Sequence, residues 1–111
     1  MKSGDIVLIP LPQSDGKIKK RPSLLLKQMP GHGDWLVCGI STQLRHYING
    51  FDEKLDTSHS DYTISGLKAP SIIRLGFLAI IPSSTIPGTF GNVSQITLKK
   101  LTGNLINHLK K

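Results

Sequence analysis

The chain has 111 residues, of which 38% are hydrophobic and 19% are charged, and this balance excludes an intrinsically disordered chain. The length suits one domain, 1–111, around a single core. No apolar run reaches the roughly 18 residues of a membrane span, and no signal-peptide segment opens the sequence, so a cytoplasmic protein is expected. Fourteen Lys and Arg against seven Asp and Glu give a net charge of +7, which favours nucleic acid or an acidic protein as partner.

The amino-terminal segment predicts two strands joined by a basic loop. The residues from Asp5 to Leu11 indicate the first strand, Ser14-Asp15-Gly16 a turn, and Ser23 to Lys27 the second strand. The loop carries clustered cations, namely Lys17, Lys19, Lys20 and Arg21. Pro22 fixes its own φ and pushes Arg21 toward extended geometry, so the guanidinium is held where the second strand begins. Such a group is suited to binding phosphate.

The middle of the chain predicts one clear strand and one polar segment. Trp35 to Ile40 indicates the third strand, in which Cys38 is expected to be an inert, buried core residue. His46 to Ser60 is polar and weakly alternating, and predicts a hairpin that turns at Asn49-Gly50. The core residues expected in this hairpin are Phe51 and Leu55.

The last part of the chain predicts a core strand and a helix. The apolar run Ser71 to Ile81 indicates a buried strand with a bend or bulge at Gly76, and Gly88 to Asn92 indicates a turn. Ser94 is the expected N-cap of an amphipathic helix. The helical spacing is set by Leu98, Leu101, Leu105 and Leu109. Gly103 inside the helix costs about 1 kcal/mol relative to Ala, so a reason for this glycine is expected, such as close packing of the helix on the barrel. The fold class is therefore mainly β with a C-terminal helix, arranged as a small, strongly bent barrel.

Three segments occur in the order seen in a known family. They are Gly4-Asp5-Ile6-Val7 leading to Lys20-Arg21-Pro22, then Ile40-Ser41-Thr42-Gln43, and then Gly66 to Arg74. With the C-terminal helix, they resemble the MazF/PemK toxins, the ribonuclease halves of bacterial toxin–antitoxin pairs, over nearly the whole chain. The resemblance implies an SH3-like barrel of the MazF/PemK/CcdB kind and a metal-independent, sequence-selective endoribonuclease (mRNA interferase) without a cofactor. It also implies a homodimer, single-stranded RNA as substrate, and an acidic antitoxin as partner.

The resemblance also assigns roles to individual residues. In such cleavage the RNA 2′-hydroxyl attacks the adjacent phosphorus, so the enzyme must stabilise a dianionic phosphorane. Arg21 is expected to stabilise this charge, and Ser41, where the family usually has threonine, to position the phosphate. Thr42 is the alternative hydroxyl if the strand end is bulged, Gln43 is expected to contact a base, and Arg74 to bind phosphate. The remaining substrate-binding residues are expected to be Lys17, Lys19 and Lys20.

One departure from the family leaves a second hypothesis open. Plasmid-borne relatives carry an acidic residue two positions after the arginine matched by Arg74, whereas this chain has Gly76. A carboxylate base is therefore absent at that position. Arg74 would otherwise require a structural partner, such as Asp5 or Asp61. The alternative is a non-catalytic toxin of the same barrel that binds a protein, as CcdB-like gyrase inhibitors do, or an inactive RNA-binding relative.

The histidines are expected to have structural or surface roles. They are His32, His46, His59 and His108. His59 is the one of interest, because the polar segment from Thr57 to Asp61 could fold over an RNA groove. No Cys/His spacing suits zinc and no acidic cluster suits magnesium, so no metal is expected.

Overall fold

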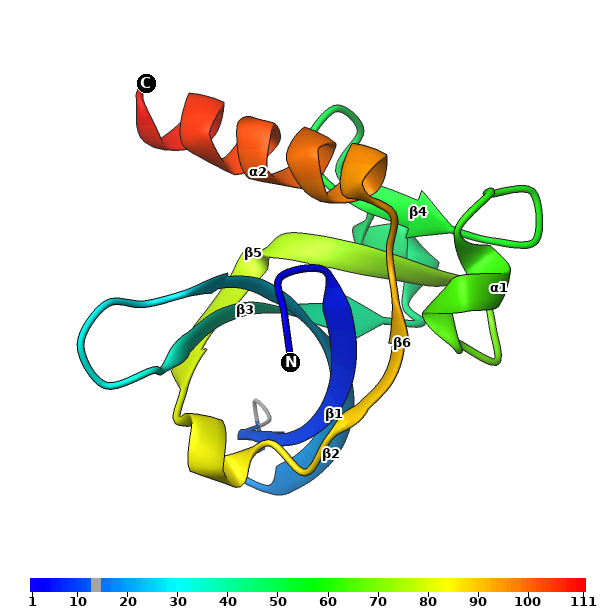
Figure 1. The fold of residues 1–111 in the computed structure, drawn as a ribbon. Helices are drawn as coiled ribbons and strands as arrows, with labels where there is room; N and C mark the ends of the chain where they lie inside the picture. The colour runs from blue at the N-terminus through cyan, green and yellow to red at the C-terminus, as the bar shows by residue number, and fades with distance from the viewer. Residues whose placement is uncertain (13–14) are drawn as a thin grey trace.

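The chain folds as a curled antiparallel sheet with a C-terminal helix across one side (Figure 1). In the computed structural model, which describes residues 1–12 and 15–111, six strands form one sheet in the order β4-β5-β3-β2-β1-β6. The strands are β1 (Asp5–Pro12), β2 (Ile18–Gln28), β3 (Trp35–Ser41), β4 (Glu53–Leu55), β5 (Ser71–Ile81) and β6 (Thr89–Asn92). The helices are α1 (Tyr62–Ser65), α2 (Gln95–Leu109) and the short 3-10 helices η1 (Leu44–His46) and η2 (Ser83–Thr85). The expected mainly β, barrel-like fold with a C-terminal helix is confirmed.

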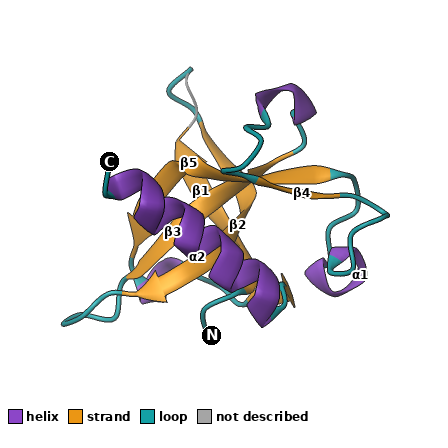
Figure 2. Cartoon of the chain, turned by 90° about the horizontal axis from the view of Figure 1, so that it is seen from above, coloured by secondary structure: helices purple, strands orange, loops and turns teal. Residues whose placement is uncertain are grey.

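Each face of the sheet carries a hydrophobic cluster, because successive side chains of a strand point to opposite faces. On one face Leu24 and its neighbours pack with the leucines of α2, which crosses the strands in Figure 2. On the other face Val7 and Leu25 belong to a second cluster. Cys38 is fully buried in the first cluster, as predicted. Burial, with a smaller contribution from the charge of Asp52, raises the pKa of this thiol.

β5 has the predicted bounds and the predicted bend. Gly39 of β3 pairs with Arg74, whereas the adjacent Cys38 pairs with Leu78. The intervening residues of β5, with Gly76 among them, are therefore outside the regular ladder as an extended bulge. The bulge separates the half of β5 that pairs with β4 from the half that runs beside the start of β3.

β2 begins earlier than the sequence predicts. β1 continues to Pro12 and pairs there with Ile18, so this hairpin is longer than expected. Part of the predicted basic loop is consequently strand, namely Lys19, Lys20 and Arg21. Arg21 lies inside β2 and pairs with Ile9, so its backbone is fixed by the ladder as well as by Pro22.

Two other local predictions are wrong. Within the described chain, the segment 46–60 contains a single strand, β4, which pairs with β5 and forms no hairpin. The buried Asp52 carboxylate fixes this segment, since it accepts the N–H groups of Ile48 and Leu75. Phe51 and Leu55 do contribute to the core. The predicted turn at 88–92 contains β6, which becomes a strand by pairing with β1.

α2 begins as predicted and ends differently. The Ser94 side chain accepts the N–H of Thr97 at 3.3 Å, which confirms the N-cap. The predicted leucines are buried as far as Leu105, whereas Leu109 is 70% exposed. A Cβ on Gly103 would meet no described atom within 4 Å. The expected close packing at this glycine is therefore wrong.

Candidate functional site

Strand register brings Arg21, Ser41 and Arg74 to one face of the sheet, here called the arginine face. Ser23 of β2 pairs with Gly39 of β3, and Gly39 pairs with Arg74 of β5. Extending the β2–β3 register by two residues puts Arg21 opposite Ser41. Paired residues of antiparallel strands share a face, and neighbouring strands lie about 4.8 Å apart. Arg21 and Ser41 are therefore cross-strand neighbours, with Arg74 one row away.

The surroundings of the arginine face are apolar and closely packed. Arg21 and Arg74 are half-buried, and Ser41 is 9% exposed. The Phe77 ring lies against Gly39, since a Cβ on this glycine would be 3.3 Å from ring atoms. Burial of this kind strengthens the attraction between a guanidinium and an anion, because the local dielectric constant is lower than in water. The face is thus suited to an anionic ligand.

The carboxylates that could have neutralised Arg74 have other partners. Asp5 accepts the N–H of Lys2 at 2.8 Å. Asp61 accepts the N–H and the hydroxyl of Ser94. No ion pair joins either carboxylate to Arg74 among the described residues. The alternative of a structural ion pair with Asp5 or Asp61 is therefore not formed, and these carboxylates do not neutralise the charge of Arg74.

Ser41 and Thr42 differ in where their hydroxyls lie. Ser41 Oγ accepts the N–H of Gln43 at 3.0 Å, and its own O–H has no acceptor in the described part of the chain. β3 pairs regularly from Gly39 to Ser41, so alternation directs Thr42 to the opposite face. Gln43 accepts a hydrogen bond from Arg45 at 2.5 Å through its side-chain oxygen, which leaves its amide nitrogen as a donor.

The predicted basic residues are all exposed, but they do not share one face. Lys19 lies two residues from Arg21 in β2 and so belongs to the same face, whereas Lys20 alternates to the other. Lys17 precedes β2, and its N–H donates to the Asp15 side chain at 2.9 Å. These cations therefore surround the start of β2, with Lys19 directed to the arginine face.

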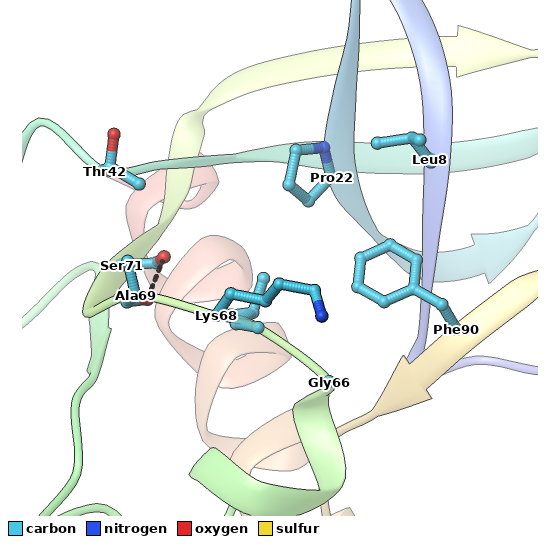
Figure 3. Close-up of a pocket in the computed structure, with 9 residues that line it drawn as sticks. Leu8, Pro22, Thr42, Gly66, Lys68, Ala69, Ser71 and Phe90 are labelled. Atoms are coloured by element: carbon cyan, nitrogen blue, oxygen red, sulfur yellow. Dashed lines mark hydrogen bonds between the residues drawn. The ribbon is translucent and has the colours of Figure 1, made fainter.

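A groove of about 630 Å³ lies on the opposite face of the same strands (Figure 3). Leu8 and Pro22, which pair across β1 and β2, form one wall. Phe90 of β6 faces them and is 43% exposed. Lys68 extends along the groove toward Phe90, and Thr42 lies at the far end. Neither residue was expected at a site: Phe90 stands in no motif, and Lys68, although it lies within the segment Gly66 to Arg74, was given no role.

Close backbone packing fixes the wall that carries Phe90. Gly66 ends α1 in the left-handed region, with φ +72°, and its Cβ position is 2.6 Å from the carbonyl oxygen of Phe90. A side chain on Gly91 would overlap the carbonyl of Ser65. Only glycine permits both approaches. Residues at the end of α1, which are distant from β6 in the sequence, therefore help to determine where Phe90 lies.

His59 has a structural role and does not cover the groove. Its Nδ1 accepts the N–H of Asp61 at 2.9 Å, so Nε2 carries the proton that is donated to Glu53 at 2.8 Å. Glu53 also pairs with Lys100 of α2 at 3.0 Å. The contacts among His59, Glu53 and Lys100 therefore connect β4 and the segment before α1 to the C-terminal helix. The other histidines, as predicted, are exposed: His32, His46 and His108.

Neither a metal site nor a membrane-spanning helix is present among residues 1–12 and 15–111. Among the described residues, no group of three or more His, Cys, Asp or Glu side chains could hold a metal ion. No helix in residues 1–12 and 15–111 has the length and apolar character to cross a bilayer.

The fold agrees with comparisons to known proteins. The family model of the PemK-like, MazF-like toxins of type II toxin–antitoxin systems matches residues 2–109. The chain therefore belongs to this toxin family. Among solved structures it is similar to the Mycobacterium tuberculosis toxin MazF-mt6, with a TM-score of 0.70, 21% identity and coverage of 96% of each chain; at this identity the likeness concerns the fold. No curated protein sequence matched the chain.

Proposed function

We propose that this protein is the toxin of a toxin–antitoxin pair and acts in the cytoplasm as a metal-independent, sequence-selective endoribonuclease on single-stranded RNA. Family membership supports the toxin role. The observation that carries the nuclease proposal is the strand register, Ser23 with Gly39 and Gly39 with Arg74, which when extended by two residues puts Arg21 opposite Ser41 on the face of Arg74. Two guanidiniums and a hydroxyl on one half-buried face fit a phosphate that gains negative charge during reaction.

The proposed reaction is transfer of a phosphoryl group within the RNA. The 2′-oxygen forms a bond to phosphorus, the bond from phosphorus to the 5′-oxygen breaks, and the product ends in a 2′,3′-cyclic phosphate. Arg21 stabilises the dianionic phosphorane, the Ser41 hydroxyl donates a hydrogen bond to a phosphate oxygen, and Arg74 binds the neighbouring charge. Neither arginine is a base at neutral pH, and Gly76 provides no carboxylate. The proton of the 2′-hydroxyl is therefore transferred to water, and the 5′-oxygen takes its proton from water.

Gln43, Lys17, Lys19 and Lys20 are proposed to bind the rest of the RNA. The amide nitrogen of Gln43 can donate to a base, since its oxygen is occupied by Arg45. The lysines supply sequence-independent attraction to the backbone. Selectivity then depends on the segments that border the arginine face rather than on the arginines themselves.

We further propose a homodimer built on the second half of β5. Leu78 is 42% exposed and Ile80 is 53% exposed on this strand. β4 pairs only with Ser71, Ile72 and Ile73, so within the described chain the outer edge of the second half of β5 has no strand partner. A second copy would cover both the apolar side chains and this edge through a two-fold interface.

An acidic antitoxin is proposed as the inhibitor. The net charge of +7 and the exposed lysines at the start of β2 favour an acidic, initially disordered segment. Such a segment would compete with RNA for the same ammonium and guanidinium groups. Inhibition would then result from occlusion of the arginine face.

The direct test is incubation of the purified protein with a long single-stranded RNA in EDTA. Cleavage at a limited set of sequences, with 2′,3′-cyclic phosphate ends, is expected. An RNA with 2′-O-methyl groups throughout should remain intact, because it lacks the nucleophile. Intact RNA in the first sample, or cleavage of the methylated RNA, would contradict the proposed reaction.

A further inference from the structure

The groove lined by Phe90 combines exposed apolar side chains with a lysine, and neither the packing of the core nor the arginine face explains this combination. Phe90 and Leu8 are large apolar residues that remain 43% and 39% exposed. Lys68, from the segment between α1 and β5, is the charged side chain that lines the groove. An exposed aromatic ring near an ammonium group is the combination that binds unpaired bases, since every base has a face that stacks and a phosphate that attracts a cation.

The groove is held open by the backbone rather than by adaptable side chains. The contacts of Gly66 and Gly91 with β6 and α1 fix the strand that carries Phe90. On the other side, Pro22 is fixed in the β1–β2 ladder opposite Leu8. Ser71 donates its hydroxyl to the carbonyl of Ala69 at 2.8 Å, which orders the segment beside Lys68. The volume of about 630 Å³ is within the range of small-molecule sites.

The groove and the arginine face meet at the end of β3. Ser41 and Thr42 are consecutive residues, as are Arg21 and Pro22, and in each pair the second residue lines the groove. Consecutive Cα atoms are about 3.8 Å apart. Thr42 is exposed beyond the last residue of β3, so an RNA strand can pass around the strand end from one face to the other.

We propose that this groove binds one unpaired base of the RNA adjacent to the cleaved phosphate. The base stacks on the Phe90 ring, and Lys68 contacts its phosphate or a carbonyl oxygen of the base. The site thereby selects the nucleotide at one position of the cleavage sequence. This inference rests on the proposed ribonuclease function for the identity of its ligand.

The test separates binding from cleavage by using a probe that cannot be cut. A fluorescently labelled 2′-O-methyl oligoribonucleotide of the preferred sequence, or a mixed-sequence pool if no cleavage is found, is titrated by anisotropy. Phe90→Ala should weaken binding about 5- to 150-fold, and Phe90→Tyr should restore it. Lys68→Gln should reduce the slope of log affinity against log salt by about 0.7, the contribution of one phosphate contact. The matched control is Ile106→Ala, which removes a side chain of similar exposure, 45%, from α2.

Cleavage profiles on a long RNA provide the second measurement. Phe90→Ala should relax the preference at one position, whereas the wild type and Ile106→Ala should share one profile. Circular dichroism of each variant excludes unfolding as the cause, and Phe90→Tyr keeps the test valid if Phe90→Ala does not fold. Wild-type binding and an unchanged profile in a folded Phe90→Ala protein would overturn the proposal. If Phe90→Ala lost binding to an acidic peptide but kept its binding to RNA, the proposal would also be overturned, and the groove would be assigned to a protein partner. If the wild type binds RNA through Phe90 without cleaving it, the proposed reaction fails and the base site stands.

Discussion

Gly91 of β6 and Ser65 at the end of α1 are in direct backbone contact, and a methyl group on Gly91 would overlap the Ser65 carbonyl oxygen. The contact joins two elements that are short and that sequence patterns identify poorly. It also fixes the strand that carries Phe90.

Gly91→Ala should therefore destabilise the protein, by about 3 kcal/mol or more, because neither backbone can move without breaking β6 from β1. Gly103→Ala is the matched control, since a Cβ there would meet no described atom within 4 Å. That change should stabilise the protein by about 0.5–1 kcal/mol through helix propensity. Urea denaturation measures both, and equal midpoints for the two variants would disprove the proposed contact.

Arg21→Ala should reduce RNA cleavage by about 10²–10³-fold, because one fixed charge contact to the phosphorane is lost. The fold should remain intact, since Arg21 is half-buried at the edge of the core. Lys27→Ala removes a cation from the other end of β2 and should leave the rate unchanged. Single-turnover rates check the prediction, and near-wild-type cleavage by folded Arg21→Ala protein would sink the mechanism.

Ser41 and Thr42 can be separated by parallel substitutions. Ser41→Ala should lower the rate at saturating RNA by about 10²-fold, whereas Ser41→Thr should retain it, since the hydroxyl remains beside Arg21. Thr42→Ala should leave the rate at saturating RNA nearly unchanged, because alternation directs Thr42 away from the arginine face. The reverse ranking of the two alanine variants would identify Thr42 as the working hydroxyl.

The proposed dimer should have twice the chain mass of 12.1 kDa in light scattering. Ile80→Asp should shift the protein to monomer, because it places a charge in an apolar interface. Ile96→Asp is the control on α2, where the side chain is already 82% exposed. A wild-type monomer that cleaves RNA would refute the dimer, and a dimeric Ile80→Asp protein would exclude β5 as its interface.

Asp61 should give the protein a specific sensitivity to acid. Burial by itself raises the pKa of Asp61, but hydrogen bonds from Thr97 and Ser94 outweigh burial and hold the pKa below its usual value. Because the folded pKa is the lower one, this stabilisation is present above the unfolded value of about 3.9 and is lost as pH falls through the folded pKa. Asp61→Asn should cost about 1–3 kcal/mol at pH 7.

Urea midpoints measured from pH 7 down to pH 2 check this prediction. The difference between wild type and Asp61→Asn should shrink as the pH falls below about 4. A difference that stays constant with pH would show that the charge of Asp61 does not matter.

The sequence predicts the long elements well and the short ones poorly. β5 and α2 have periodic apolar patterns long enough to exclude other structures, and the N-cap at Ser94 is a local signal. The residues of β6 predict a turn, because glycine and asparagine favour turns. They form a strand because they pair with the edge of β1. The segment 46–60 likewise depends on a distant contact, from Asp52 to Leu75.

The candidate site also contains some residues that the sequence predicts and others that it does not. The family resemblance predicts Arg21, Ser41 and Arg74 as site residues, and the pairing of β2, β3 and β5 explains how residues far apart in sequence share one face. Phe90 and Lys68 could not be found, because the packing of α1 against β6 creates their groove. A residue that depends on a contact between two irregular segments leaves no periodic signal in the sequence.

The burial of Cys38 has a practical consequence. This cysteine is the single thiol of the chain, it is fully buried, and burial raises its pKa, so little reactive thiolate forms in the native state. A cysteine introduced at an exposed position can therefore be modified with a fluorophore or spin label while the native residue remains in place. The native cysteine therefore does not have to be replaced before site-specific labelling. Modification of Cys38 itself would measure how often the core opens.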